Sequence, residues 1–447
     1  MDADYANRLE WFRQFKEHVN ASANTLIVGI DIGKDTHHAF MGTPAGRTIY
    51  RRLIFENSIY GFDRLLFLIK SQMSDKQLTE VVIGVEPTSV YHKPLAEYLI
   101  GLGYRVVYVT NTAIKKNRAI LDGRWDKNDT KDAANVADLV SRGRCHFYDL
   151  PDMNLRDIRN LLSLRKRLKK QEHRVMTRIR NNLVAQYFPE LDGAWYRCRQ
   201  ENLAIVRFCL EPEKIAALSF DDFCRMVTRR RRGIRQYQRL RHIHEVAEDS
   251  IGCRVGSSVA FEAQLLVENL QRAREQIAEV EEQLHLICGS YKEYELLQTI
   301  PGFGPFVSAV VLGAIGYAQR FENSRQLLRL AGLDLNASRS GKTSQSAVPV
   351  ISKVGKADLR YALYQAAKVA TSLTAEFKAY FKRLLKGRQK EKGIKTKMRV
   401  KVSAKMLVIA WTLMKTQQPY KAGLLVIDEP VQPRGRSYFD RDNAGPS

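Results

Sequence analysis

The sequence has few cysteines and no long apolar run. Its cysteines are widely spaced, with no C-x-x-C pair and no compact disulfide framework: Cys145, Cys198, Cys209, Cys224, Cys253 and Cys288. No run of about 18 apolar residues occurs, and the N-terminal stretch MDADYANRLEWFRQFKEHVN is charged throughout. These absences argue against a zinc ribbon, a disulfide-stapled domain, a secreted protein and a membrane partner. They favour a reducing cytoplasm.

Acidic residues are scarce relative to basic ones. The 447-residue chain has 72 Lys and Arg against 48 Asp and Glu, which gives a formal net charge of +24 and a pI near 9.8. A surplus of this size on a globular chain favours a polyanionic partner, and nucleic acid is the default. With 45% apolar residues, a chain of this length can bury large cores and should divide into two or three domains.

The tetrapeptide Ser-Gly-Lys-Thr at 340–343 looks like the end of a phosphate-binding P-loop. The full motif needs a glycine five residues before the Gly-Lys pair, and that position is Asn336. A P-loop also follows a buried strand, whereas 324–333 reads as a helix that ends at Gly332. The sequence therefore disfavours an ATP-binding loop here.

Residues 24–112 alternate between strand-like and helix-like segments. Strands are expected at 25–33, 37–43, 48–58, 80–87 and 104–110, and helices at 60–72 and 90–103. Three strands joined by short links and followed by strand, helix and strand are typical of an α/β domain. Its first three strands should form an antiparallel meander.

The strand signal disappears after about residue 154. Two one-sidedly basic stretches follow, at 156–180 and 225–241, and such blocks repel themselves unless an anion neutralises them. A solvated helix face is the alternative. The predicted nucleic-acid contacts in these stretches are Arg165, Lys166, Arg167, Lys169, Lys170, Arg230, Arg231 and Arg232.

A heptad stripe follows the basic stretches. Apolar residues recur at alternating spacings of four and three, at Leu266, Leu270, Ala273, Ile277, Val280, Leu284 and Ile287. The stripe predicts a coiled coil that could hold two protomers together. The alternative is an intramolecular hairpin with a helix at about 158–185, and both can hold at once.

The region from about 292 to 417 is expected to be helical. Pro301-Gly302-Phe303-Gly304 lies between two expected helices, where Gly302 and Gly304 would let backbone N–H groups approach a DNA phosphate. A tight turn between helices is the alternative. Residues 378–405 hold twelve Lys and Arg against one acid, a further polyanion contact. The tail from about 418 is expected to be flexible.

Four acidic residues form a possible metal site. Asp31 and Glu86 each end an apolar strand, where an ionised side chain is costly unless a cation pairs with it. Asp129 and Asp132 are three apart at a helix start and so share a face. Singly they could be turn, strand-end and helix-cap residues. Together they could bind two Mg²⁺ ions, one to activate the attacking oxygen and one to stabilise the leaving oxygen, as in enzymes that cleave phosphodiester bonds.

With these residues the sequence resembles the DEDD transposases of bacterial insertion sequences, which are bridge-RNA-guided serine recombinases. The motifs that carry the resemblance are GIDIGKD, GVEPTSVYHKPLA, KNDTKDA, TIPGFGPFVSAVVLGAIG, LAGLDL and ISKVGKADLRYAL, in the family's order over roughly 25–415. The fold implied is an α/β RuvC-like (RNase H fold) N-terminal domain, a helical coiled-coil middle region and a mainly α C-terminal transposase domain. The implied boundaries are an extension at 1–23, these domains at 24–153, 154–291 and 292–417, and a tail at 418–447.

The resemblance also implies the roles of individual residues. Asp31, Glu86, Asp129 and Asp132 match the four acidic positions that hold Mg²⁺. Ser340 matches the serine nucleophile that attacks a DNA phosphate, and Lys342 and Lys353 would contact DNA beside it. Other serines close by remain alternatives, namely Ser338, Ser344 and Ser346.

The implied partners are donor DNA, target DNA and a structured noncoding guide RNA, in the bacterial cytoplasm at the nucleoid. The family also implies a homo-oligomer, with a dimer that becomes a tetramer in the synaptic complex. Base pairing would carry the DNA specificity, so the protein sequence does not encode the target. The alternatives are a RuvC-like metal-dependent endonuclease or Holliday junction resolvase without a covalent serine step, and a non-catalytic RNA-binding protein. A sugar kinase, suggested by DIGKDT at 31–36, lacks further nucleotide-binding motifs.

Overall fold

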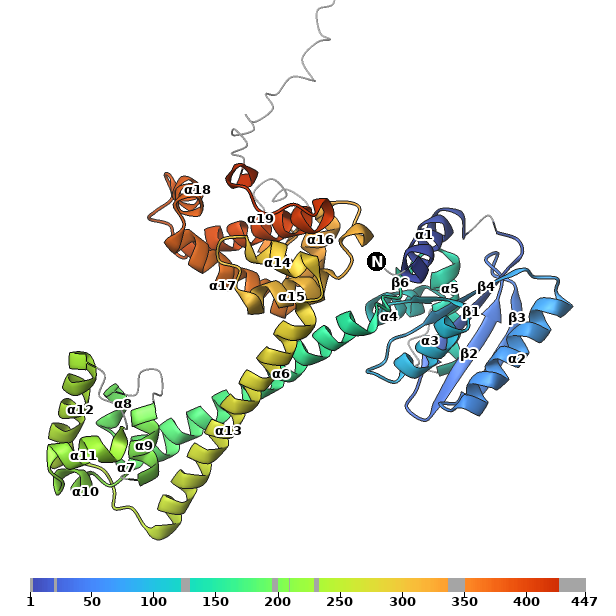
Figure 1. Cartoon of the computed structure of the whole chain (residues 1–447). Coiled ribbons are helices and arrows are strands. Elements are labelled where there is room, and N and C mark those ends of the chain that lie inside the picture. The colour runs from blue at the N-terminus through green and yellow to red at the C-terminus, as the bar shows by residue number, and fades with distance from the viewer. Residues whose placement is uncertain are drawn as a thin grey trace, which may run out of the picture. The chain divides into compact units, whose positions relative to one another are not determined.

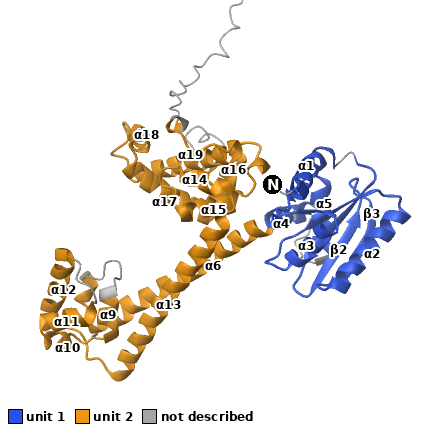
Figure 2. Cartoon of the chain, viewed as in Figure 1, with its two compact units in different colours: residues 1–152 blue, residues 153–447 orange. Residues whose placement is uncertain are grey.

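The computed structural model divides the chain into two compact units, residues 1–152 and 153–447 (Figures 1 and 2). It describes residues 3–19, 22–121, 129–194, 200–208, 210–228, 233–336 and 350–425. The first unit is a mixed α/β domain, and the second is mainly helical with one short two-stranded sheet. The predicted change from strands to helices after about residue 154 is confirmed.

A six-stranded mixed sheet forms the centre of the first unit. Its strands are β1 (Thr25–Ile32), β2 (Thr36–Gly42), β3 (Thr48–Glu56), β4 (Glu80–Val85), β5 (Arg105–Tyr108) and β6 (His146–Phe147), in the order β3-β2-β1-β4-β5-β6. The first three strands pair antiparallel, β4 and β5 continue parallel to β1, and β6 pairs antiparallel with β5. The predicted meander is confirmed, and β6 is an additional strand.

Helices cover both faces of this sheet (Figure 1). They are α2 (Ile59–Asp75), α3 (His92–Gly101), α4 (Asn111–Leu121) and α5 (Asp129–Ser141). Val28 and Ile30 of β1 share a core with α2 and α3, whereas Ile27 packs with α4 and α5. Because side chains alternate along a strand, Asp31 lies on the same face of β1 as Ile27.

Helix α1 (Ala3–His18) is part of the first unit. The Tyr5 hydroxyl donates to Asp149 Oδ1 at 2.9 Å, and Arg8 Nη2 donates to the Leu150 carbonyl at 2.8 Å. Trp11 and neighbouring aromatic side chains pack beside the core that α5 covers. We expected residues 1–23 to form an N-terminal extension. The structure differs because aromatic side chains hold this charged helix on the domain.

Two long helices of the second unit, α6 (Met153–Arg178) and α13 (Ser257–Cys288), lie side by side (Figure 1). Arg165 pairs with Glu281 at 2.5 Å and Arg178 with Glu262 at 2.7 Å, so the helices are antiparallel. Six of the seven heptad residues, all except Ile287, are buried within the chain. Of the two interpretations of the stripe, the intramolecular hairpin is the one that this chain forms.

Short helices pack at one end of the helix pair. They are η2 (Ile179–Val184), α7 (Ala185–Tyr187), α8 (Leu191–Ala194), α9 (Gln200–Phe208), α10 (Pro212–Ala216), α11 (Phe220–Val227) and α12 (Gly233–Glu248). Ile179 and Phe188 share their core with Leu266 and Leu270 of α13. The first turns of α13 are therefore fixed by this helical cluster as well as by α6.

The other end of the helix pair joins the C-terminal helices. The elements there are α14 (Lys292–Gln298), α15 (Pro305–Ile315), η3 (Ala318–Arg320), α16 (Ser324–Ala331), β7 (Leu335–Asn336), β8 (Val350–Ile351), α17 (Ala357–Leu373), α18 (Ala375–Leu385), α19 (Ile394–Thr416) and η5 (Ala422–Leu425). Ile158 of α6 and Leu284 of α13 lie in the same core as these helices. Packing therefore crosses the boundary that we expected near residue 291.

The start of the expected tail packs on the C-terminal helices. The Tyr420 hydroxyl donates to Glu376 Oε2 at 2.9 Å, its N–H donates to Thr299 Oγ1 at 2.9 Å, and Leu425 is buried. Residues 418–425 therefore differ from the flexible segment that we expected, because apolar and aromatic side chains anchor them. None of the helices in the described stretches is both long and apolar enough to cross a membrane.

Candidate active site

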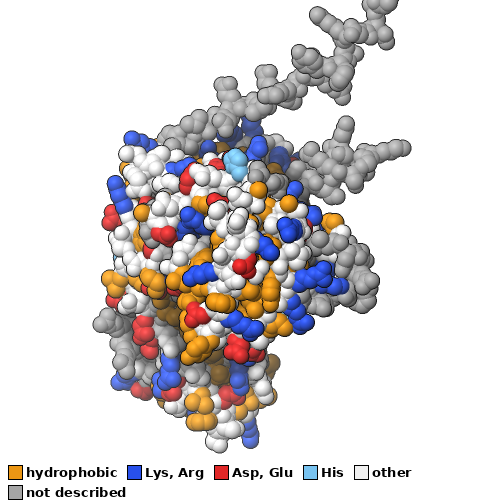
Figure 3. Space-filling view, turned by 90° about the vertical axis from the view of Figure 1, so that its right-hand side faces the viewer, with side chains coloured by type: hydrophobic (Ala, Val, Ile, Leu, Met, Phe, Trp, Pro, Cys, Tyr) orange, Lys and Arg blue, Asp and Glu red, His pale blue; other side chains and the backbone are white. Residues whose placement is uncertain are grey.

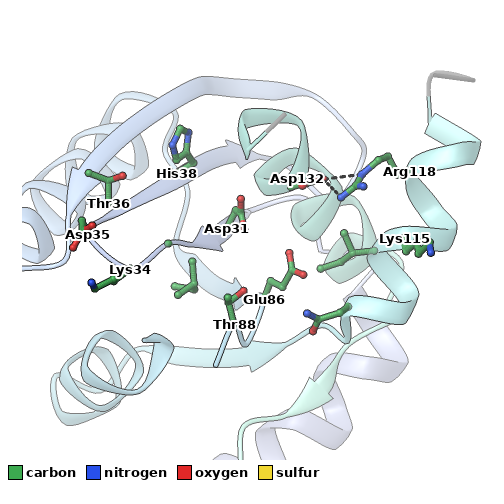
Figure 4. Close-up of a pocket in the computed structure, with 14 residues that line it drawn as sticks. Asp31, Lys34, Asp35, Thr36, His38, Glu86, Thr88, Lys115, Arg118 and Asp132 are labelled. Carbon is green, nitrogen blue, oxygen red and sulfur yellow. Dashed lines mark hydrogen bonds and ion pairs between the residues drawn. The ribbon is translucent and has the colours of Figure 1, made fainter. Parts of the chain in front are cut away.

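Strand pairing brings Asp31 and Glu86 to the same edge of the sheet. β1 and β4 run parallel with Ile30 opposite Val85, and the Glu86 N–H donates to the Ile30 carbonyl at 3.1 Å. Each acid directly follows one of these paired residues. Both acids therefore lie at the C-terminal edge of the parallel strands, where α/β proteins commonly bind ligands. Figure 4 shows the two side chains in one pocket.

Two glycines allow α5 to lie directly on the sheet. A Cβ on Gly29 would lie 2.2 Å from the carbonyl oxygen of Ala133, and a Cβ on Gly84 would lie 2.5 Å from Val140 Cγ2. This close approach sets the first turns of α5 beside β1. Asp132, which is only 2% exposed, lies on these turns and is the third predicted acid in the pocket, which exposed Asp35 also lines.

An arginine holds Asp132. Arg118 of α4 donates from Nε and Nη2 to Asp132 Oδ1, at 2.9 and 2.6 Å (Figure 4). The same two helices are joined by Asn117, whose Nδ2 donates to Asn135 Oδ1 at 2.8 Å. A carboxylate this deeply buried needs such partners, because its removal from water is costly.

The three acids line a cavity of about 610 Å³. Positive charges lie on its walls as well, at Lys34, Lys115 and Arg118. His38 also lines it and stands opposite Asp31 in the pairing of β1 with β2, so the two side chains share a face. Acidic and basic groups in one cavity suit a phosphate that binds together with a divalent cation.

The acids supply the ligand type that Mg²⁺ requires. Mg²⁺ is usually bound by one or two carboxylates together with water and substrate phosphate oxygens, rather than by an all-protein cage. Asp31 and Glu86 offer such a pair. Among the described side chains no three His, Cys, Asp or Glu residues are grouped closely enough to hold a metal ion, and the side chain of Asp129, the first residue of α5, is not among those described. The residues present fit a cation that is shared with a phosphate.

Two stretches of the chain match transposase families. Residues 28–189, which include the three described acids, match a family model for DEDD transposases of IS110, described as "Transposase". Residues 294–382 match the "Transposase IS116/IS110/IS902 family". The two matches together cover more than half of the chain. The chain is a DNA transposase of the IS110 family.

Two similar proteins belong to insertion sequences. The transposase is 24% identical over 413 residues to the transposase for insertion sequence element IS1111A of Coxiella burnetii. The aligned residues cover 92% of this chain and 95% of the relative. The transposase is 25% identical over 322 residues to the uncharacterized 43.6 kDa protein of insertion element IS110 of Streptomyces coelicolor, which covers 71% of this chain and 77% of the relative. The similarity therefore extends well beyond the acidic pocket.

The predicted nucleophile of the transposase lies outside the described residues, as do Ser338, Ser344, Ser346 and Lys342 around Ser340. The structure describes both ends of the segment that contains them, residues 337–349. β7 pairs antiparallel with β8, and the Ser352 hydroxyl donates to Asp334 Oδ1 at 2.5 Å. The two ends of the serine segment are therefore held together.

Two glycines fix the chain next to that segment. Gly332 has a φ of +64°, and a Cβ on Gly355 would lie only 2.6 Å from the Gly332 nitrogen. Lys353, a predicted DNA contact, is exposed and donates its N–H to the Gly332 carbonyl at 3.1 Å. Lys353 is therefore an exposed residue at the point where the backbone of residues 353–355 packs against Gly332.

Several predicted basic contacts on α6 bind acids of the transposase itself. The guanidinium carbon of Arg165, which pairs with Glu281, lies 3.7 Å from the centroid of the Phe306 ring, and its side chain is only 16% exposed. Lys166 donates to Asp358 at 2.8 Å. These contacts stabilise the packing of α6 and leave less of its charge for a nucleic acid.

The remaining basic predictions divide into three groups. Lys169 is exposed and donates to Glu172 at 2.9 Å, and Arg167 and Lys170 are exposed as well. Arg230, Arg231 and Arg232 lie outside the described residues. On the face drawn in Figure 3, Lys and Arg side chains are spread among hydrophobic and polar ones. The positive charge on that face is therefore distributed over the surface.

Gly302 and Gly304 lie in the turn between α14 and α15. Gly302 has a φ of +86°, and a Cβ there would lie 2.5 Å from the Ala366 carbonyl oxygen of α17. The tight turn, which was the structural alternative at this position, therefore accounts for Gly302. A Cβ on Gly304 would have nothing within 4 Å, so its surroundings are open.

Our interpretation of the sequence missed α4 and with it Arg118. The signal was present in the spacing, because Asn111, Ile114, Lys115 and Arg118 follow the i, i+3, i+4, i+7 pattern of one helix face, and all four line the cavity. His38 was also missed. Its position opposite Asp31 could have been inferred from the short link between the first two strands.

Proposed function

We propose that this transposase cleaves and rejoins DNA at the acidic pocket through a covalent serine step, with a RuvC-like fold at 24–153. The observation that carries the proposal is the placement of Asp31 and Glu86 side by side at the sheet edge, in a cavity that Asp132 also lines. The antiparallel meander followed by parallel strands supports the fold, and the net charge of +24 supports a polyanionic substrate.

In this proposal Ser340 is the nucleophile. Its Oγ forms a bond to the DNA phosphorus, the ester bond to the neighbouring deoxyribose breaks, and the serine proton leaves through solvent to the released deoxyribose oxygen. Asp31, Glu86, Asp129 and Asp132 would hold Mg²⁺, taken as two ions, which would supply positive charge to the attacking and leaving oxygens. Rejoining is the same exchange in reverse with a different DNA end.

The proposed partners are donor DNA, target DNA, a structured guide RNA and further copies of the chain, in the bacterial cytoplasm at the nucleoid. The exposed basic residues Arg167, Lys170 and Lys353 support backbone contacts with nucleic acid. We propose that the RNA and the second protomer bind the helical region 154–291. Ser340 belongs to the region 292–417. A second protomer would have to use the outer surface of the helix pair, because the heptad stripe is buried.

The test of the covalent step is adduct trapping. Full-length protein is incubated with DNA of the element's ends, Mg²⁺ and the RNA transcribed from the noncoding DNA beside the gene. A protein-DNA adduct that survives denaturing electrophoresis is expected for the unmodified chain and for Ser338→Ala, Ser344→Ala and Ser346→Ala. It should be missing for Ser340→Ala, because only that variant lacks the attacking oxygen.

Each outcome decides between defined alternatives. Loss of the adduct in one of the other serine variants would move the nucleophile to that residue. Mg²⁺-dependent cutting of branched DNA with no adduct in any variant would favour the endonuclease that lacks a covalent step. Full activity without RNA would remove the guide RNA from the proposal.

A further inference from the structure

One face of α4 forms a wall of the acidic cavity. Asn111, Ile114, Lys115 and Arg118 all line the cavity, and they are spaced as one helical stripe. The next lysine, Lys116, is exposed but is not part of the lining. The helix therefore distinguishes two neighbouring lysines, one on the cavity side and one on the outer side.

Arg118 connects the cavity to its most deeply buried acid. Its side chain is 22% exposed, whereas that of Asp132 is 2% exposed. Arg118 Nε and Nη2 both donate to the same oxygen, Asp132 Oδ1. A guanidinium has five N–H donors, so donors remain beyond the two that Asp132 receives. A cation can bind the other carboxylate oxygen while the arginine stays in place.

A phosphate in this cavity needs positive charge from more than one side. Asp31 and Glu86 repel a phosphodiester unless a cation neutralises them. Lys115 and Arg118 provide charge from the α4 wall without a metal ion. Arginine suits this role because its planar donors match phosphate oxygens, and Asp132 fixes the orientation of the plane.

We propose that Arg118 binds the phosphate at which DNA is cut, that Asp132 orients its guanidinium, and that Lys115 contacts the adjoining backbone. The inference rests on the proposed function, because it places the reacting phosphate in this cavity. It adds a phosphate-binding wall to the acidic residues. It also gives Asp132 a positioning role beside any metal ligation.

The test removes the charge of the phosphate as well as that of the protein. Rates of DNA cleavage are measured with element-end DNA that carries either a normal phosphate or an uncharged methylphosphonate at the cut site. Arg118→Lys should cut normal DNA about 10- to 100-fold more slowly, the range expected for loss of a hydrogen bond to a charged group. It should cut methylphosphonate DNA at the rate of the unmodified protein, because the charge it recognises is gone.

Arg118→Lys is preferred to Arg118→Ala because it keeps a cation beside buried Asp132. Its matched control is Arg142→Lys, at an ion pair with Asp138 of 2.9 Å outside the cavity, which should cut both DNAs normally. Lys115→Ala, at an exposed position, should slow cleavage of normal DNA about 3- to 10-fold, and Lys116→Ala should not.

The outcomes separate this inference from the proposed function. The proposed contact between α4 and the DNA would be overturned by two results together. These are equal cleavage rates for Lys115→Ala and Lys116→Ala, and an Arg118→Lys defect of the same size on normal and methylphosphonate DNA. Asp31→Asn inactivity in the same assay would leave the acidic site standing. If Asp31→Asn cleaves normally, the acidic site is wrong and this inference falls with it.

Discussion

The acidic pocket of the first unit and the α6–α13 helix pair of the second are both rich in charge, but they use it differently. In the pocket, strand ends place Asp31 and Glu86 in a cavity that a ligand can enter. In the helix pair, arginines such as Arg165 and Arg178 bind acids on the facing helix. The comparison teaches that the place of a charge in the fold indicates a candidate functional site better than the number of charges in a segment.

The largest expected effect is at the pocket. Asp31→Asn removes the charge from one of the two adjacent carboxylates, and DNA strand exchange should fall by at least about 1000-fold in a single-turnover assay, because cation binding supplies several kcal/mol to phosphoryl transfer. The control is Asp75→Asn at the exposed end of α2, which should retain full activity. Comparable activity of the two variants would contradict the assignment of the pocket as the active site.

The packing that builds the pocket should be nearly as sensitive. Gly29→Ala forces a methyl group against the α5 backbone, and we expect a loss of about 3 kcal/mol in the free energy of unfolding, because neither helix nor strand can shift without repacking. Urea unfolding of the full chain measures it. Gly101→Ala, at a helical glycine with nothing within 4 Å of the added Cβ, should be neutral or slightly stabilising. Equal stability of both variants would mean that α5 does not lie on β1.

The sequence predicted that Asp31 and Glu86 lie at the ends of apolar strands. The pairing of β1 with β4, which the structure shows, brings these two strand ends together. Arg118 depends on tertiary packing instead, since it reaches Asp132 only when α4 and α5 lie together on one face. The family resemblance supplied Ser340, whose position lies outside the described residues.

Charge patterns and terminal segments were harder to interpret for the same reason. A run of arginines looks the same in the sequence whether its partner is a phosphate or a glutamate more than a hundred residues away, as with Arg165 and Glu281. Helix α1 is charged overall, and only the burial of side chains such as Tyr5 makes it part of the domain. Contacts between residues far apart in the sequence decide the role of a basic segment and the packing of a terminal helix, and a sequence pattern does not show these contacts.

Two basic residues of α6 should separate packing from nucleic-acid binding. Arg165→Ala loses a salt bridge and an aromatic contact, so the free energy of unfolding should fall by about 1–2 kcal/mol. Exposed Lys170→Ala should leave stability unchanged but weaken binding of DNA or RNA and reduce its salt dependence. Urea titration and fluorescence anisotropy at several salt concentrations measure the two effects. The same profile for both variants would remove the distinction between packing residues and nucleic-acid-binding residues on α6.

The smallest expected effect is a difference in how the two regions respond to acid. Burial lowers the pKa of His37, whose ring lies beside Phe55 and Phe62 in the sheet domain. In the helix pair, burial acts to raise the pKa of Glu172, but hydrogen bonds from Lys169 and Arg274 outweigh it and leave the pKa lowered. His37 should therefore respond at a higher pH than Glu172.

The sign follows from proton uptake. Below pH 6.5 His37 takes up a proton in the unfolded chain, whereas in the folded chain its lowered pKa keeps the ring neutral. The stability that the neutral ring contributes is therefore present above pH 6.5 and is lost as the pH falls towards the folded pKa. We expect the unfolding free energy to fall between pH 7.5 and pH 5.5, with His37 contributing to the loss because burial lowers its pKa. Glu172 should contribute only below about pH 4.5, where the unfolded carboxylate becomes protonated.

The measurement is urea unfolding of the full chain at both pH values, with His37→Phe and the control His18→Gln. His37→Phe keeps a ring in the core and removes the titrating nitrogen atoms, so its loss of stability on acidification should be smaller than that of the unmodified chain. His18 is exposed at the end of α1, and His18→Gln should follow the unmodified chain. If His37→Phe loses as much stability as the control, the acid response of the sheet domain comes from its other histidines. His92 and His146 are the first candidates, because burial lowers the pKa of each.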